Sequence, residues 1–153
     1  MPRVSNSNEE KFIITMKNIL VLCTGNSCRS QLAEGYLRHF AGSKANIYSA
    51  GIETHGVNPK AIQVMGEDHI DISAHTSNHV DEYLNIPFDY VITVCDNANE
   101  ACPFFPGKVQ RFHKNFPDPA KAKGTPEEIM NEFRRVRDMI KAYAADFVQT
   151  NLK

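Results

Sequence analysis

Apolar residues along this chain come in short runs that alternate with segments repeating at helical spacing. The strongest run, at residues 17–22, has four consecutive aliphatic side chains before a Thr-Gly-Asn turn, which predicts a buried strand. Three further strands are predicted where β-branched and aromatic residues gather, at residues 46–51, 88–95 and 109–112. Strands this apolar must be covered on both faces, which is typical of a parallel sheet.

Helices are predicted between and after these strands, at residues 30–40, 59–67 and from 126 to the C-terminus. Gly42 stands where the first helix would end, and Asn58 stands where a side chain would cap the second. A capping box at residues 125–128 begins the third. One helical turn is expected at residues 81–84, and residues 97–123, with their four prolines, are expected to be mostly irregular.

This order of elements predicts an α/β fold in which helices flank a parallel sheet. The chain has 153 residues, the length of a single domain. We expect that domain to span residues 16–153, because residues 1–15 are mostly polar and resemble an appended tail. Within this tail, residues 12–15 could form an extra edge strand, and Met1 or Met16 could be the native start.

Composition and charge remove several classes of function. Seventeen basic and 18 acidic side chains give a net charge of −1, so overall positive charge cannot hold this protein to nucleic acid. The longest apolar run, of about five residues, is too short to span a bilayer. No apolar signal segment follows Arg3, so we expect a cytoplasmic protein without a membrane partner.

The chain has four cysteines, at Cys23, Cys28, Cys95 and Cys102. A structural disulfide framework is not expected in a reducing cytosol, which leaves thiol chemistry or metal ligation. Four residues separate the first pair and six the second, and neither spacing is typical of a zinc site. We therefore favour thiol chemistry and keep zinc binding as the alternative.

Residues 23–30 join the first strand to the first helix and carry the clearest chemical signal. A turn of this kind aims backbone N–H groups into one concavity beside the positive end of the helix dipole. Gly25 and Asn26 most readily take the left-handed conformations that such a turn requires. A tetrahedral oxyanion could then be bound by the loop and by a guanidinium at its rim. The expected oxyanion-binding residues are Thr24, Gly25, Asn26, Ser27, Cys28 and Arg29.

The same field favours the thiolate form of Cys23, which we expect to be the nucleophile, with the Ser30 hydroxyl donating to its sulfur. Cys28 is expected to be a small apolar filler behind the loop. The lysine of a nucleotide-binding loop is absent, so ATP or GTP is not indicated. Asp118, between two prolines, is the candidate proton donor for the leaving oxygen, although a turn aspartate in solvent is the plainer alternative.

The chain resembles the low-molecular-weight tyrosine phosphatase fold family, and most closely the thioredoxin-coupled arsenate reductases within it. The resemblance covers residues 17–150 and implies a four-stranded parallel sheet flanked by helices. A phosphatase of this type has a proline and a substrate-stacking tyrosine where this chain has Gln31 and Ala120. Cys95 and Cys102 match the reductase pattern. The stretches that carry the resemblance are residues 23–35, 48–59, 75–77, 94–95, 102–103 and 133–138.

The resemblance implies reduction of arsenate to arsenite, an arsenic detoxification, by a relay of three cysteines. Cys23 would attack arsenic, Cys95 would then attack Cys23, and Cys102 would attack Cys95. The disulfides Cys23–Cys95 and Cys95–Cys102 would form in turn, and thioredoxin would reduce the second. The alternatives are a tyrosine phosphatase that hydrolyses phosphate monoesters through a phosphocysteine, and an oxyanion-binding module without catalysis.

Two departures from the family pattern bear on this interpretation. The usual Trp-Gly before the acid aspartate is replaced within residues 113–116, and the chain has no tryptophan. Some members bind potassium beside the loop, with an aspartate at position 78, where this chain has Asn78. One anionic ligand is therefore missing, and we expect no tightly bound cofactor and at most a weak potassium site. The other matching positions are Asn26, Glu34, Ser49 and Thr76.

Overall fold

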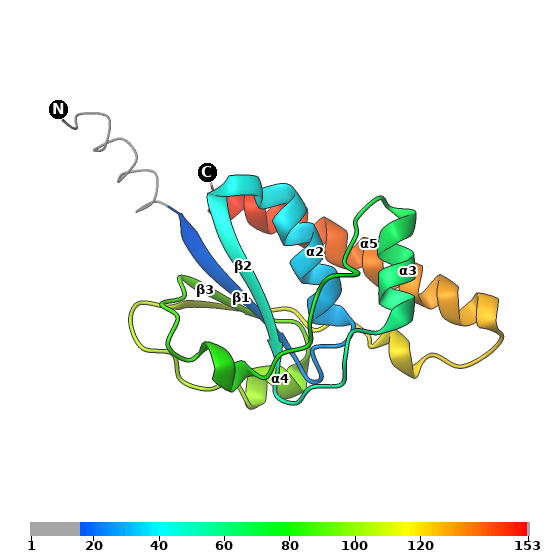
Figure 1. Ribbon diagram of the computed structural model, residues 1–153, viewed down its shortest axis with the longest axis horizontal. Coiled ribbons are helices and arrows are strands. Elements are labelled where there is room, and N and C mark those ends of the chain that lie inside the picture. The colour runs from blue at the N-terminus through cyan, green and yellow to red at the C-terminus, as the bar shows by residue number, and fades with distance from the viewer. Residues whose placement is uncertain (1–15, 153) are drawn as a thin grey trace.

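The structure is a computed structural model of the protein, and it describes residues 16–152. Four parallel strands form its central sheet in the order β2-β1-β3-β4 (Figure 1). The strands are β1 (Lys17–Cys23), β2 (Ala45–Gly51), β3 (Tyr90–Thr93) and β4 (Gln110–His113). The predicted four-stranded parallel sheet is therefore confirmed, whereas the predictions for residues 1–15 lie outside the described residues.

Four α-helices accompany the sheet within the described part of the chain. They are α2 (Arg29–Ala41), α3 (Pro59–Glu67), α4 (Asp96–Glu100) and α5 (Pro126–Asn151). In Figure 1, α2, α3 and α5 lie together on one side of the sheet, and α4 lies near the carboxyl ends of the strands. Three short 3-10 helices complete the set, η1 (Gly42–Lys44), η2 (Val80–Tyr83) and η3 (Pro119–Lys121).

The helix boundaries follow the predicted caps. The Asn58 side chain accepts a hydrogen bond from the Lys60 N–H at the start of α3, and a capping box between Thr125 and Glu128 starts α5. Gly42, with φ of 56°, ends α2 by donating its N–H to the Arg38 carbonyl. These local signals were sufficient to predict where the helices begin and end, because each bond joins residues that are at most four positions apart.

Two predictions for residues 81–123 need correction. The third strand is shorter than 88–95, because Phe88 packs into the core before the strand begins and Cys95 caps α4 after it ends. Residues 97–100, expected to be irregular, belong to the helix α4, and buried Ala98 packs this short helix onto the sheet. The expected turn at residues 81–84 is the 3-10 helix η2, which starts one residue earlier.

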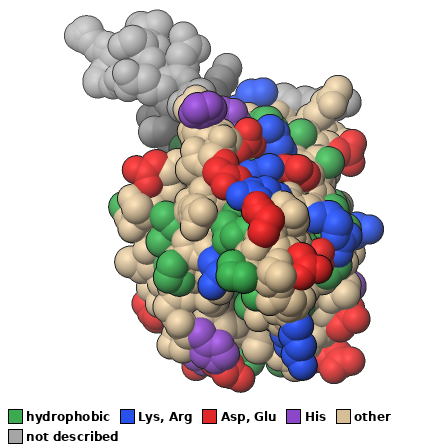
Figure 2. All heavy atoms as spheres, turned by 90° about the vertical axis from the view of Figure 1, so that its right-hand side faces the viewer, with side chains coloured by type: hydrophobic (Ala, Val, Ile, Leu, Met, Phe, Trp, Pro, Cys, Tyr) green, Lys and Arg blue, Asp and Glu red, His purple; other side chains and the backbone are tan. Residues whose placement is uncertain are grey.

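The central strand is buried to the extent that a parallel sheet requires. Residues 19–22 of β1 are completely buried, so both faces of the central strand are covered, as in other α/β sheets. Figure 2 shows acidic and basic side chains interspersed on one face of the molecule, in keeping with the small net charge. Within residues 16–152, no helix has both the length and the apolar character needed to cross a membrane.

Candidate active site

The loop after β1 is held open by the segment that follows β2. The carbonyl oxygens of Thr24, Gly25 and Ser27 accept hydrogen bonds from the N–H groups of residues 53, 55 and 58, at 2.9 to 3.0 Å. In a trans peptide the N–H points away from the carbonyl of the preceding residue. The N–H groups of residues 25, 26 and 28 are therefore turned to the opposite side, where an anion could be bound.

This arrangement needs a close approach of β2 to the loop. A Cβ atom on Gly51 would overlap the Glu53 carbonyl oxygen and would lie 2.7 Å from the Asn26 nitrogen. Asn26 has a φ of 47°, the left-handed conformation predicted for it. Gly25 does not share that conformation; instead, a Cβ there would lie 2.6 Å from Nδ1 of His55, so its requirement is steric.

Asn26 is buried, and its side chain connects the loop to the structure behind it. Its Oδ1 accepts from the Asn78 backbone N–H at 2.7 Å, which fixes the orientation of the amide. Its Nδ2 donates to the Ser30 hydroxyl at 2.8 Å and to the Ser49 hydroxyl at 3.0 Å. The Ser49 hydroxyl in turn donates to Glu34 at 2.6 Å, so the chain of bonds ends on a carboxylate.

The Cys23 sulfur lies on the floor of this loop, at the carboxyl end of β1. The Ser30 oxygen is 2.9 Å from Sγ and already accepts a hydrogen bond from Asn26. Its own hydrogen is therefore available for the sulfur. A hydroxyl in this place stabilises a thiolate, which is the reactive form of a cysteine nucleophile.

Arg29 and Asp118 face each other beside the loop. The guanidinium donates to the Phe116 carbonyl at 3.1 Å and lies 3.6 Å from the Asp118 carboxylate. Asp118 also caps η3, accepting the Ala120 N–H at 3.0 Å. A cavity of about 320 Å³ opens between them and the loop, and its lining includes Cys23, Arg29, His55, Asp118 and Lys121. The cavity brings the predicted nucleophile, cation and acid together.

Cys95 is next to the loop although it is far from it in the sequence. Leu22 pairs with Thr93 in the sheet, and the Val94 N–H donates to the Leu22 carbonyl at 2.9 Å. The Cys95 sulfur consequently lies 3.3 Å from the Thr24 hydroxyl and accepts a hydrogen bond from the Ala98 N–H at 3.4 Å. Cys23 ends β1 and Cys95 lies two residues beyond the end of the neighbouring strand β3, so both lie at the carboxyl ends of the central strands.

Cys102 lies beyond α4 and has different surroundings. Arg111 of β4 donates to its sulfur at 2.8 Å and to the Pro103 carbonyl at 3.1 Å. Among the four cysteines, all of which are free thiols, Cys102 alone is partly exposed. Cys28 is buried in the loop wall, and burial raises the pKa of its thiol well above the usual range. A neutral, buried thiol agrees with the predicted filler role.

Comparison with known proteins identifies the family. Residues 18–153 match the family described as low molecular weight phosphotyrosine protein phosphatase. The chain belongs to this family. Members that resemble it include an arsenate reductase from Halalkalibacterium halodurans, which is 50% identical over 134 residues, 88% of this chain and 96% of that protein. An arsenate reductase from Bacillus subtilis is 48% identical, with the same shares covered.

A solved structure in this family supports the assignment of the fold. An arsenate reductase in the phosphate-binding state superposes with a TM-score of 0.73 at 28% sequence identity. The match covers 90% of this chain and 100% of that one. The four-stranded parallel sheet and its flanking helices are thus a fold shared with known members of the phosphatase family.

The residues at the positions where some family members bind potassium make hydrogen bonds within this chain. One oxygen of Glu34 accepts the Ser49 hydroxyl, and the other accepts Nε of Arg38 at 2.8 Å. Oδ1 of Asn26 is also occupied by a backbone donor. A guanidinium therefore already neutralises the carboxylate, and Asn78 adds no negative charge. Among residues 16–152, no group of three or more acidic, histidine or cysteine side chains could hold a metal ion.

Three residues near the cysteines were not singled out by sequence reasoning. His55 lines the cavity and forms a pair with Glu53 at 2.6 Å. Asn97 donates to the Thr24 hydroxyl at 3.1 Å, and Arg111 contacts Cys102. Each of these residues contacts a segment that is distant in the sequence, so no local sequence pattern predicts its role. Only His55 lies within a stretch that resembles the family.

Proposed function

We propose that this protein is an arsenate reductase that uses a relay from Cys23 through Cys95 to Cys102, with a thioredoxin-type dithiol as electron donor. The observation that carries the proposal is the position of the Cys95 sulfur, 3.3 Å from the hydroxyl of the residue after Cys23. A hydrolase has no use for a second thiol at that edge. The close similarity to arsenate reductases over most of the chain supports the same conclusion.

The first step binds and activates the oxyanion. Arsenate is tetrahedral like phosphate, so the loop N–H groups and the Arg29 fork suit it. The Cys23 thiolate attacks arsenic and one arsenic–oxygen bond breaks. Asp118, which lies beside the guanidinium, gives a proton to the departing oxygen, which leaves as water. The product of this step is a thiol–arsenate adduct on Cys23.

The second step is the reduction itself. The Cys95 sulfur attacks the Cys23 sulfur, and the proton of the Cys95 thiol passes to solvent. The sulfur–arsenic bond breaks and its electron pair stays on arsenic, so arsenic(V) becomes arsenic(III) and leaves as arsenite. The two sulfurs are oxidised to the Cys23–Cys95 disulfide, which balances the two electrons gained by arsenic.

The third step requires α4 to unwind. Five helical residues advance a chain by about 7.5 Å, and Cys95 and Cys102 lie just outside the two ends of this helix. The Cα atoms of a disulfide lie only about 4.4 to 6.8 Å apart. Once α4 unwinds, Cys102 can attack Cys95, which frees Cys23 as a thiol and leaves the Cys95–Cys102 disulfide. A protein dithiol then reduces this bond and restores the enzyme.

A phosphatase that works through a phosphocysteine is the second candidate, because Cys23, Arg29 and Asp118 would serve that reaction equally well. Gln31 and Ala120 occupy the positions where the tyrosine phosphatases of this fold have proline and a stacking tyrosine, which favours the reductase. Side-by-side assays of p-nitrophenyl phosphate hydrolysis and of thioredoxin-coupled arsenate reduction separate the two candidates.

The decisive test is a thiol count with disulfide mapping before and after addition of arsenate. Without a reductant, one equivalent of arsenate should remove two thiols per molecule and release one arsenite. Peptide mapping should find the new bond between Cys95 and Cys102, with Cys23 free again. Four unchanged thiols after exposure to arsenate would refute the proposal.

A further inference from the structure

The segment after α4 presents an aromatic side chain to solvent beside the last thiol of the relay. Phe104 is 81% exposed, and it is the only exposed large hydrophobic residue in the described part of the chain. Cys102 is two residues before it and is the cysteine with access to solvent. Burying such a ring against a partner protein would be favourable, and its place two residues after the last cysteine of the proposed relay suits it to that use.

Phe104 is held outward by rigid neighbours. Phe105 is buried, and its ring packs edge-on against Phe88 with centroids 5.6 Å apart. Proline on both sides of the Phe-Phe pair restricts the backbone. Arg111 ties the start of the segment to β4 through its bonds to the Cys102 sulfur and the Pro103 carbonyl. The backbone that carries the ring is therefore anchored to the core through Phe105, which is one residue from Phe104 and three from Cys102.

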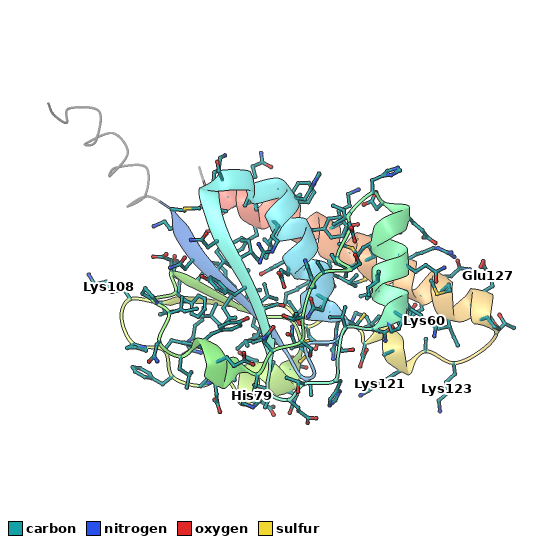
Figure 3. The ribbon with its side chains drawn as sticks, viewed as in Figure 1. Lys60, His79, Lys108, Lys121, Lys123 and Glu127 are labelled. Atoms are coloured by element: carbon teal, nitrogen blue, oxygen red, sulfur yellow. The ribbon has the colours of Figure 1, made fainter. Side chains whose placement is uncertain are left out.

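The charge of this segment is predominantly basic. From residue 101 to residue 117 the chain contains three basic residues, Lys108, Arg111 and Lys114, and no acidic residue. Two exposed acidic residues adjoin the segment, Glu100 and Asp96, and Asp96 is paired with His113 at 2.7 Å. Figure 3 shows Lys108 pointing outward from the loop before β4, on the opposite side of the molecule from Lys121 and Lys123. The region around Cys102 thus combines an apolar anchor with positive charge, away from the lysine at the substrate cavity.

We propose that Phe104, Pro103, Lys108 and Arg111 form a docking surface, here called the exit surface, for an acidic protein that carries a reducing dithiol. The inference rests on the proposed function, because that relay delivers its disulfide to Cys102. A small thiol needs only access to the sulfur, whereas a protein donor must be seated so that its own cysteine lines up with the disulfide. Aromatic anchors of this kind dominate the binding energy of many interfaces.

The docking step needs no new chemistry. The donor thiolate attacks one sulfur of the Cys95–Cys102 bond and forms a mixed disulfide, and the second donor thiol resolves it. The donor is oxidised to its disulfide, and both cysteines of this chain are returned as thiols. Phe104 takes no part in these exchanges, so its removal should change only how well the donor is seated.

The test compares two electron donors on one disulfide. In a Cys23→Ser, Cys28→Ala background, Cys95 and Cys102 are the remaining thiols, and diamide can join them without arsenate. We expect Phe104→Ala to lower the second-order rate of reduction by thioredoxin about tenfold and to leave the dithiothreitol rate unchanged. Phe104→Leu, which keeps an apolar anchor, should restore most of the thioredoxin rate.

Three results would overturn the exit surface. These are an unchanged thioredoxin rate in Phe104→Ala, an equal loss with both donors, or failure of diamide to join Cys95 and Cys102. The experiment does not depend on arsenate, so it separates this inference from the function proposed above. A wild-type protein that ignores arsenate while Phe104→Ala still impairs reduction by thioredoxin would refute the reductase and keep the docking surface.

Discussion

The hydroxyl of Thr24 lies 3.3 Å from the sulfur of Cys95, although the two residues are 71 positions apart in the sequence. Asn97, from the first turn of α4, donates to the same hydroxyl oxygen at 3.1 Å. Because that oxygen already accepts a hydrogen bond, its own hydrogen is available for the cysteine sulfur. The oxyanion loop and the second cysteine of the proposed relay are therefore connected by one side chain.

Replacing Thr24 by valine should slow the second step of the proposed reaction. Valine keeps the shape of threonine but cannot donate to the Cys95 sulfur, so the attacking thiolate loses one hydrogen bond, worth about 1 kcal/mol. We expect the single-turnover rate of Cys23–Cys95 disulfide formation to fall about fivefold, measured by rapid acid quench and mass mapping. Thr24→Ser keeps the hydroxyl and should react at nearly the wild-type rate. Equal rates for valine and serine would exclude this role.

Arg29 should contribute most of the affinity for the oxyanion. Its guanidinium lines the cavity beside Asp118, and charge-assisted hydrogen bonds are worth about 1.5 to 3 kcal/mol. Arg29→Ala should weaken binding of sulfate or arsenate at least tenfold, measured by isothermal titration calorimetry. Arg29→Lys keeps the charge but loses the bidentate fork, so its oxyanion affinity should lie between those of the wild type and Arg29→Ala.

A matched control for Arg29 lies on α5. Arg135 is exposed and forms a pair with Glu132 at 2.7 Å, one turn away on the helix surface. Arg135→Ala removes the same charge from the protein and should leave the oxyanion affinity unchanged. If both alanine variants weakened binding equally, the effect would come from the net charge rather than from the loop.

The loop could be predicted from the sequence because its geometry is local. Cys23, Ser30 and the strand and helix that hold them lie within residues 17–41, and the bond between the two side chains joins positions seven apart. Asn26 in a left-handed conformation also follows from residue type. The steric reason for Gly25 could not be predicted, because it depends on the ring of His55, which reaches the loop only in the folded chain.

The surroundings of Cys95 and Cys102 could not be predicted from the sequence for the same reason. α4 consists of five mostly polar residues with little helix propensity, and it forms because Cys95 caps it and Ala98 packs beneath it. The contact between Arg111 and Cys102 joins β4 to the loop that follows α4. Neither feature leaves a periodic pattern in the sequence, so neither could be recognised within the segment that is predicted to be irregular.

Cys102 should be needed for recycling and dispensable for the first turnover. Cys102→Ser retains Cys23 and Cys95, so arsenate should release one arsenite per protein and then stop at the Cys23–Cys95 disulfide. The measurements are the arsenite yield per protein and the mass of the disulfide-linked peptides. Steady turnover of this variant with thioredoxin and thioredoxin reductase would remove Cys102 from the scheme.

Acid should destabilise the protein partly through His75. Burial lowers the pKa of its imidazole below the usual value of 6.5, although Glu34 lies 3.7 Å away. Below pH 6.5 the unfolded chain therefore takes up a proton at this position that the folded chain does not. The unfolded state binds more protons there, so the free energy of unfolding falls as the pH is lowered.

Replacing His75 by asparagine should make the free energy of unfolding fall less steeply as the pH is lowered. The measurement is the free energy of unfolding by urea at half-unit intervals from pH 7.5 to pH 5.0. The variant can be less stable throughout, because it loses the 3.0 Å bond to Gln31, so the slope with pH is the quantity to compare. Identical slopes for wild type and His75→Asn would show that His75 is protonated equally in the folded and unfolded states.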